Sequence, residues 1–238
     1  MDRRSFLTYS AGGLAASSFA GHVLAASMTA GDRLEPPAKG TIKVAVAVAD
    51  AATVIDFAGP WEVFQDVMVM DRGASHEEQM PFELYTVAAT KEPIRASAGL
   101  HIIPDFSIDD APAPHVLVVG AQRADDRLRN WIKSASASTA LTMSVCTGAF
   151  QLARAGLLDG LTATTHHDFY DDFARQFPKV TLVRDQRYVE HPRIATSGGL
   201  TSGIDLALRV VQRYFGTEVA ERTAVYMEHQ STRWMNPT

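Results

Sequence analysis

Uninterrupted apolar runs alternate along this chain with segments whose apolar residues recur at helical spacing. The apolar runs predict strands at 41–49, 82–89, 115–119, 141–145, 180–183, 188–190 and 194–197. The helical pattern predicts helices at 60–70, 123–135, 147–157, 166–176, 202–215 and 218–227, and the segment 94–103 predicts a hairpin. Strands that alternate with helices in this order predict an α/β fold with a mostly parallel sheet covered by helices on both faces.

The length of the chain suits one such domain. Of its 238 residues, 46% are hydrophobic and 21% are charged, which provides enough apolar material for a packed core. We expect the domain to span residues 41–230 and a short tail to follow at 231–238. Residues 27–40 include two adjacent prolines and predict a disordered lead-in.

The first 26 residues resemble a targeting signal. Arg3 and Arg4 stand in the sequence RRSFL, which is typical of a twin-arginine signal peptide, and small residues follow to about Ala20. The sequence VLAA at 23–26 offers a cleavage site. We therefore expect a periplasmic or secreted protein that is exported after folding; the alternative is an ordinary amphipathic N-terminus.

Charge and hydropathy exclude two classes of partner. The formal net charge is −5 without a strongly basic segment, so nucleic-acid binding is not expected. No stretch approaches the roughly 20 apolar residues of a membrane span, so stable membrane insertion is not expected either. The chain has one cysteine, which cannot form an internal disulfide.

That cysteine, Cys146, stands where a predicted strand meets a predicted helix, in the sequence SVCTG. This arrangement resembles a nucleophile elbow, in which a sharp turn exposes the reactive side chain. A helix N-terminus beside the sulfur favours the thiolate, so we expect a depressed pKa for Cys146. The alternative is a buried structural cysteine.

Five segments together resemble the ThiJ/PfpI (DJ-type) superfamily. They are DFAGP at 56–60, SVCTGA at 144–149, AGLLDG at 155–160, ATTH at 163–166 and GGLTSGID at 198–205. The resemblance covers roughly residues 42–222, and its nearest branch is the isocyanide hydratase-like group, which is also similar to the amidase-like sensor domain of AraC-type regulators. Each segment alone is weak, but the ordered set is specific.

The resemblance implies a flavodoxin-like three-layer sandwich of the class I glutamine amidotransferase-like type, as a homodimer that needs no cofactor. It implies that Cys146 is the nucleophile and that Asp56 is its acidic partner, reaching the sulfur from the loop after the first strand. It further implies that Thr147 contributes an N–H to an anion pocket and that the turn at Gly120 supplies the other side.

Asp56 and the Gly120 turn also have their own arguments from the residues. A carboxyl among apolar residues near a thiolate has a raised pKa and can donate a proton near neutral pH; the alternative is a capping or turn aspartate. The turn reads Val119-Gly120-Ala121-Gln122, which departs from the Pro-Gly-Gly of the superfamily. Ala121 can donate its N–H only if the backbone angles allow it, so this departure puts the anion pocket in doubt.

The remaining candidates have structural explanations. His166 and His167 are adjacent, so on a helix they point about 100° apart, and no metal site is expected. His166 is expected to line the pocket or to cap a helix, and Gly198 and Gly199 to form a tight turn against the site. Asp205 is expected on a helix face, without a role as an acid.

Two functions fit these observations. The first is an enzyme of the isocyanide hydratase type, which converts a small-molecule isocyanide to an N-formamide with Cys146 and Asp56. The second is a non-catalytic protein on the same scaffold that binds a small molecule or senses oxidative stress. A regulator is not expected, because no DNA-binding module follows the domain and an exported protein does not reach DNA.

Overall fold

The computed structural model describes residues 33–235. The predicted signal peptide and the lead-in up to residue 32 lie outside the described residues. Within residues 33–235, no helix is long and apolar enough to cross a membrane.

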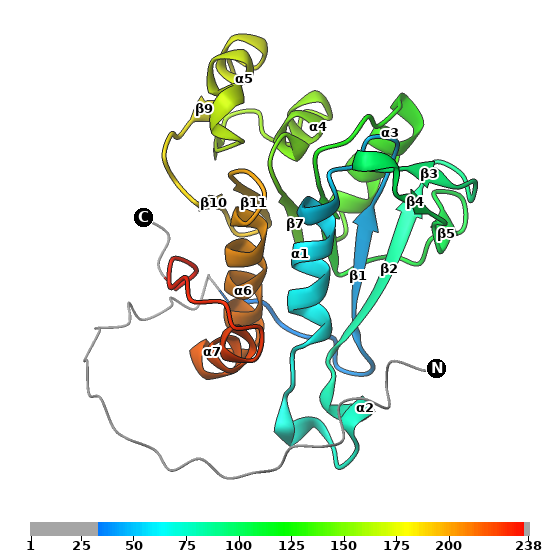
Figure 1. Ribbon diagram of the computed structural model, residues 1–238, viewed down its shortest axis with the longest axis vertical. Helices are drawn as coiled ribbons and strands as arrows, with labels where there is room; N and C mark the ends of the chain where they lie inside the picture. The colour runs from blue at the N-terminus through cyan, green and yellow to red at the C-terminus, as the bar shows by residue number, and fades with distance from the viewer. Residues whose placement is uncertain (1–32, 236–238) are drawn as a thin grey trace.

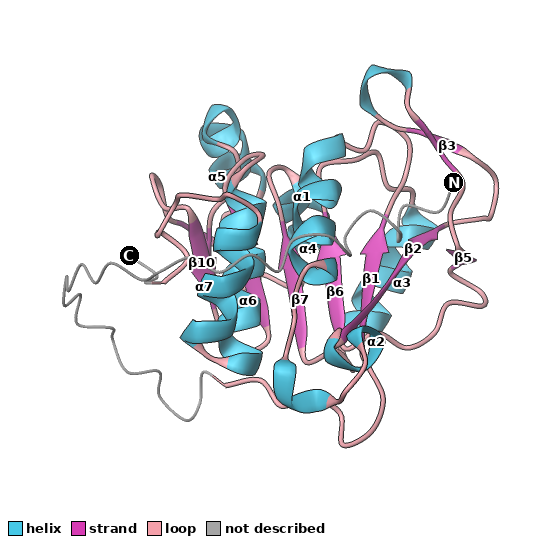
Figure 2. Cartoon of the chain, turned by 60° about the horizontal axis from the view of Figure 1, so that its bottom comes forward, coloured by secondary structure: helices cyan, strands magenta, loops and turns pink. Residues whose placement is uncertain are grey.

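A large sheet of seven strands forms the middle of the molecule. Its order is β10 (Tyr188–Glu190), β11 (Ile194–Ser197), β7 (Leu141–Ser144), β6 (Val116–Val119), β1 (Ile42–Ala47), β2 (Phe82–Ala88) and β5 (Phe106–Ser107). Neighbouring strands are parallel except β10 and β11, which are antiparallel. Figure 2 shows these strands between two layers of helices. The predicted mostly parallel sheet is confirmed.

Helices cover both faces of the sheet. One face carries α1 (Val54–Gln65), α6 (Ser202–Phe215) and α7 (Thr217–Tyr226), and α1 and α6 lie side by side in Figure 1. The other face carries α3 (Asp126–Ser136), α4 (Gly148–Arg154) and α5 (Tyr170–Gln176). In β1, Val44 and Val46 pack toward the first layer, whereas Ala45 and Ala47 pack toward the second. Alternate residues of one strand therefore serve two cores, which is why its sequence is apolar throughout.

Short elements account for most differences from the sequence-based prediction. The predicted hairpin consists of β3 (Ile94–Arg95) and β4 (His101–Ile102), joined by a 3-10 turn at Ser97–Gly99. The prediction lacks β5, β8 (Thr162–Ala163), the 3-10 turn Met70–Arg72 and α2 (His76–Gln79). β8 pairs with β9 (Thr181–Leu182) in a separate small sheet. Strands of two residues owe their pairing to tertiary contacts and leave no periodic pattern in the sequence.

The start of α1 corrects a prediction. Pro60 was expected in the first turn of a helix beginning there, but α1 begins at Val54, with Thr53 as its N-cap residue. Pro60 lies inside this helix and cannot donate a hydrogen bond to the carbonyl of Asp56 four residues earlier. Asp56 is therefore in the first turn of a helix, and not in a free loop.

Parts of both terminal segments belong to the packed domain. Leu34, which was assigned to the disordered lead-in, is buried, and its N–H donates to the carbonyl of Arg213 at 3.0 Å. Trp234, which was assigned to the tail, is only 1% exposed, and its carbonyl accepts from Tyr188 Oη at 2.9 Å. The domain thus extends beyond residues 41–230, because single apolar side chains in polar segments complete its core.

Candidate active site

Four strands end level with one another at one edge of the large sheet. Ala47 of β1 pairs with Val119 of β6, Val119 pairs with Ser144 of β7, and Ser144 pairs with Thr196 of β11. Ligand sites of open parallel sheets lie outside such carboxyl ends, near the point where the strand order reverses. The segments that follow these strands carry Asp56, the Gly120 turn, Cys146 and the Gly198-Gly199 turn.

Cys146 follows β7 on a turn with a left-handed backbone conformation, at φ 59°. This conformation costs a non-glycine residue about 1 kcal/mol or more, so it persists only where neighbouring groups hold it. The N–H of Cys146 donates to the carbonyl of Gly198 at 2.9 Å, and its carbonyl accepts from Thr165 Oγ1 at 2.9 Å. The predicted strand-to-helix elbow is present, and two other segments fix it.

Gly148 allows α4 to begin directly against the neighbouring strand. A Cβ atom at this position would lie 2.1 Å from the carbonyl oxygen of Val119, closer than any side chain can pack. A glycine is therefore required two residues after the cysteine, because α4 approaches the end of β6 so closely.

Asp56 is fully buried at the start of α1. Its Oδ2 accepts a hydrogen bond of 3.1 Å from the N–H of Ala121. Its Oδ1 is buried without a hydrogen bond of standard geometry. The Cys146 thiol and the Leu200 N–H both interact with this carboxyl and lower its pKa. A Cβ atom at Gly120 would lie 2.9 Å from Asp56 Cβ. The carboxyl and the thiol are thus brought together.

Both members of this pair hold their protons strongly. Burial raises the pKa of the Asp56 carboxyl above its usual value, against the opposing effect of the Ala121 N–H. Burial first, and then the negative charge of Asp56, raise the pKa of the Cys146 thiol to about 12, against the opposing effect of the Thr147 N–H. The depressed thiol pKa expected from the helix N-terminus is therefore wrong, because that argument counted one favourable N–H and left out the removal of the sulfur from water.

The Cys146 thiol stabilises the Asp56 carboxylate, and that carboxylate in turn makes the thiol harder to ionise, so the pair retains one proton at pH values between the two pKa values. That proton resides either on sulfur, beside a carboxylate, or on the Asp56 carboxyl, beside a thiolate. A reactive thiolate can therefore form within the pair when the proton moves to Asp56, without transfer to bulk water.

Two backbone N–H groups lower the pKa of the Cys146 thiol, those of Thr147 and Leu200. Thr147 was expected to donate here. Leu200 was missed; it follows the Gly198-Gly199 turn and has a left-handed φ of 53°. The double glycine was the one available signal that the backbone turns sharply at this place. Both N–H groups stabilise negative charge on the sulfur.

The Ala121 N–H of the Gly120 turn is not free for the anion pocket that was expected there. The Ala121 N–H already donates to Asp56 Oδ2, and the Ala121 carbonyl accepts from the N–H of Thr53 at 2.9 Å. An anion bound beside Cys146 therefore cannot receive the Ala121 N–H without displacing Asp56. In this chain the turn positions the carboxyl.

His166 lies against the Gly198-Gly199 turn. A Cβ atom at Gly199 would lie 2.1 Å from His166 Cδ2, so the ring occupies the space that a side chain there would need. His166 also lowers the pKa of Asp56 through its charge. This histidine is thus a neighbour of the reactive pair, and Gly198 fixes the elbow through its carbonyl.

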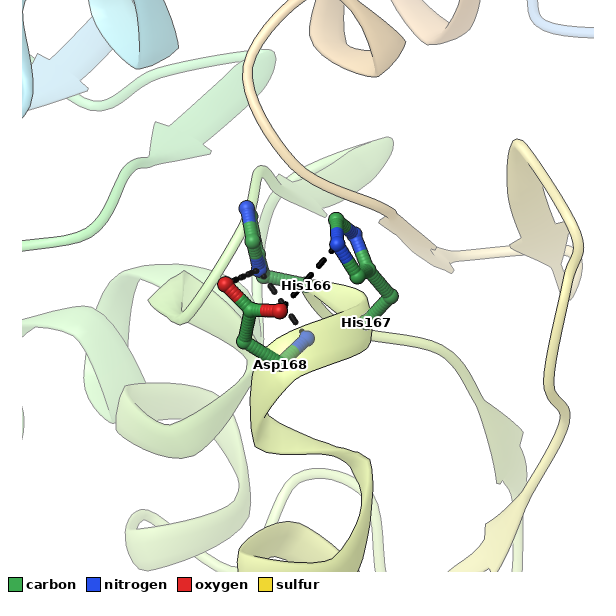
Figure 3. Close-up of side chains that lie close together, drawn as sticks. All are labelled: His166, His167 and Asp168. Atoms are coloured by element: carbon green, nitrogen blue, oxygen red, sulfur yellow. Dashed lines mark hydrogen bonds and ion pairs between the residues drawn. The ribbon is translucent and has the colours of Figure 1, made fainter.

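His166, His167 and Asp168 form a compact cluster, shown in Figure 3. The two rings stack with centroids 4.4 Å apart, rather than diverging as on a helix, because His166 has an extended backbone before the 3-10 turn His167–Phe169. His166 Nδ1 accepts from the Asp168 N–H at 3.2 Å, and His167 Nε2 lies 3.1 Å from Asp168 Oδ1. These local interactions account for the cluster, so we assign no metal to it.

Asp205 lies on a helix, as predicted. It is fully buried in the first turn of α6. Arg187 Nε donates to one carboxyl oxygen at 2.6 Å, and His229 Nε2 lies 2.8 Å from the other. Arg187 also donates to Thr201 Oγ1 at 3.3 Å, so this ion-pair group supports the turn that carries Leu200.

Comparison with known proteins agrees with this arrangement. The DJ-1/PfpI family model matches residues 42–213. An isonitrile hydratase from Pseudomonas putida is 32% identical over 144 residues, which are 58% of this chain and 61% of that protein. The HTH-type transcriptional regulator GbdR from Pseudomonas aeruginosa is also 32% identical over 144 residues, but these cover only 39% of its length. This chain therefore spans about two fifths to three fifths of these two relatives.

Solved structures support the same assignment. A ThiJ/PfpI family protein from Pseudomonas syringae superposes with a TM-score of 0.68 at 25% identity, covering 88% of this chain and 84% of that one. Drosophila melanogaster DJ-1beta shares the fold, with a TM-score of 0.66 at 16% identity over 81% of this chain and 100% of that one. Because the family model spans most of the described domain, the chain belongs to the DJ-1/PfpI family.

Proposed function

We propose that this protein is an enzyme of the isocyanide hydratase type, which adds water to an isocyanide to form an N-formamide. The observation that carries the proposal is the buried pair of Asp56 and Cys146, in which a carboxyl with a raised pKa lies beside a thiol. The similarity to an isonitrile hydratase supports this choice of reaction. The substrate is a neutral small molecule, in keeping with a site whose central groups share one proton.

The reaction proceeds in two stages. Cys146 passes its proton to Asp56, and the thiolate forms a bond to the terminal carbon of the isocyanide, while Asp56 delivers the proton to that carbon. The product of this stage is a thioimidate, in which sulfur, hydrogen and nitrogen are bonded to carbon. The N–H groups of Thr147 and Leu200 stabilise the thiolate before attack and after release.

Water completes the reaction. The Asp56 carboxylate takes a proton from water as the oxygen bonds to carbon, and it passes that proton to nitrogen. The carbon–sulfur bond then breaks, the hydroxyl becomes the carbonyl of the N-formamide, and its proton returns to the Asp56–Cys146 pair. One water is consumed and the protein is regenerated.

A second candidate function is binding or oxidative sensing without turnover. The observation in its favour is that the Ala121 N–H is already bonded to Asp56, which leaves the anion pocket without that donor. The chain is also similar to GbdR, which is named a transcriptional regulator, and to DJ-1 structures. The fold is therefore not limited to proteins that are named hydratases.

Turnover distinguishes the two candidates. Purified protein is incubated with a panel of isocyanides, and N-formamide is measured for the wild type and for Cys146→Ser. We expect formamide from the wild type and its loss in Cys146→Ser, whose hydroxyl does not ionise in this pair. Absence of product from the wild type across the panel would contradict the enzyme and favour the second candidate.

Three further features belong to this proposal. The protein is exported by the twin-arginine route, since Arg3 and Arg4 precede a stretch of small residues. It acts in the periplasm or outside the cell. It works as a homodimer, as the resemblance to the superfamily implies.

A further inference from the structure

The turn Gly120-Ala121-Gln122 is held from several sides. Gln122 Nε2 donates to the carbonyl of Ala47, the last residue of β1, at 3.1 Å. Gln151 Nε2 donates to the carbonyl of Gln122 at 3.0 Å. Both of these hydrogen bonds hold Gln122. The residue before it, Ala121, donates its N–H to Asp56 Oδ2.

Gln151 comes from the helix that begins at the cysteine elbow. It lies in α4 and is only 5% exposed, which is uncommon for a glutamine side chain. Arg129 Nε donates to Gln151 Oε1 at 3.4 Å, and Arg129 Nη2 donates to the carbonyl of Ala124 at 3.0 Å. Because a guanidinium only donates, it fixes the amide oxygen toward itself and the amide nitrogen toward Gln122.

These contacts connect the two reactive groups through the protein. The elbow of Cys146 continues into α4, α4 holds the turn through Gln151, and the turn holds the Asp56 carboxyl through Ala121. Gln122 supplies an independent anchor to β1. The turn in this chain lacks the Pro-Gly-Gly sequence of the superfamily, and these two side chains restrain it instead.

We infer that Gln151 and Gln122 are positioning residues that hold the Ala121 N–H against Asp56 and thereby decide how the shared proton divides between Asp56 and Cys146. The inference rests on the proposed function in that it concerns the same reactive pair. It does not require that an isocyanide be the substrate.

The direction of the effect follows from the Ala121 hydrogen bond, which stabilises the Asp56 carboxylate. If the turn moves and this bond weakens, the proton shifts toward the carboxyl, and a larger fraction of Cys146 is thiolate while the pair holds one proton.

The test uses alkylation, because Cys146 is the one cysteine of the chain. Rates with iodoacetamide are measured against pH for the wild type, Gln151→Met and Gln122→Met. Gln212→Met is the matched control, because Gln212 is also a buried glutamine, 4% exposed, near the C-terminal end of α6. Its side chain accepts from Arg209 Nη1 at 2.8 Å and donates to Thr217 Oγ1 at 3.0 Å. Circular dichroism and thermal unfolding report whether each variant is folded.

We expect the pH-independent part of the alkylation profile to rise about three- to tenfold in Gln151→Met and Gln122→Met, as for one weakened hydrogen bond to a charged group, and to stay at the wild-type rate in Gln212→Met. Wild-type profiles in both folded variants would overturn the inference, as would an equal change in Gln212→Met. Failure of both variants to fold would also overturn it, since their role would then be stability of the fold. A shifted profile without any isocyanide turnover would sustain this inference and contradict the proposed function.

Discussion

The carboxyl of Asp56 and the thiol of Cys146 interact in the protein interior, although they follow strands that are separated by β6 in the sheet. Neither group is ionised easily there, because burial raises the pKa of both. The chemistry available to the site is therefore that of a pair that shares one proton. The predictions below test how the fold builds this pair and what the pair does.

Replacing Gly148 with alanine should destabilise the protein, because the new Cβ would lie 2.1 Å from the backbone oxygen of Val119. We expect a loss of about 2 kcal/mol or more in the free energy of unfolding, the scale of an overpacked core. Urea unfolding measures this loss. Gly59→Ala is the control: its Cβ would lie 3.0 Å from Ile204 Cγ1, a side-chain atom that can shift, so we expect a change within about 1 kcal/mol. Equal losses in the two variants would contradict the backbone explanation.

Replacing Asp56 with asparagine should lower isocyanide turnover by roughly 10²-fold or more, the scale of general acid–base catalysis. Asparagine keeps the size of the side chain and can accept from the Ala121 N–H, but it cannot take up the thiol proton. The measurement is kcat for formamide production, with protein folding checked by circular dichroism. If Asp56 had only a capping role, turnover would stay near the wild-type value, because asparagine caps equally well.

The sequence predicts the export route as well. Changing both Arg3 and Arg4 to lysine should leave the protein in the cytoplasm with its first 26 residues uncleaved, because the paired arginines are what the twin-arginine route recognises. Cell fractionation and the mass of the purified chain report the outcome. Export of the double variant through the same route would contradict the signal assignment.

Light scattering tests the predicted assembly. At micromolar concentration we expect the mass of a homodimer, about twice the 25.8 kDa of the full chain or slightly less after cleavage of the signal. The expectation comes from the resemblance to the superfamily. A monomer mass under these conditions would contradict it.

The sequence predicted the long strands and helices well, because buried parallel strands such as β1 and β6 consist of unbroken apolar residues. It misplaced the start of α1, since Pro60 looks like a first-turn residue when only local rules are applied. It also missed the burial of Leu34 and Trp234, which stand in mostly polar terminal segments. A single side chain that fills a core from a terminal segment has no periodic pattern around it.

For the site, the motif resemblance led to Asp56 and Cys146, and the elbow geometry led to Cys146 independently. The sequence did not reveal that Ala121 donates to Asp56, nor that Gln151 holds the turn, because both depend on which segments meet at the sheet edge. The thiol pKa had the wrong predicted direction for a related reason. Local sequence indicates a helix N-terminus, whereas desolvation depends on everything packed around the sulfur.

The most direct test of the shared proton is the pH profile of Cys146 alkylation in the wild type and in Asp56→Asn. For the wild type we predict a rate that is independent of pH between the ionisations of Asp56 and Cys146, followed by a rise toward the Cys146 pKa of about 12. For Asp56→Asn we predict no such flat region, but a continuous rise to a single pKa that is lower than in the wild type, because the neighbouring negative charge is gone. Superimposable profiles for the two proteins would contradict the account.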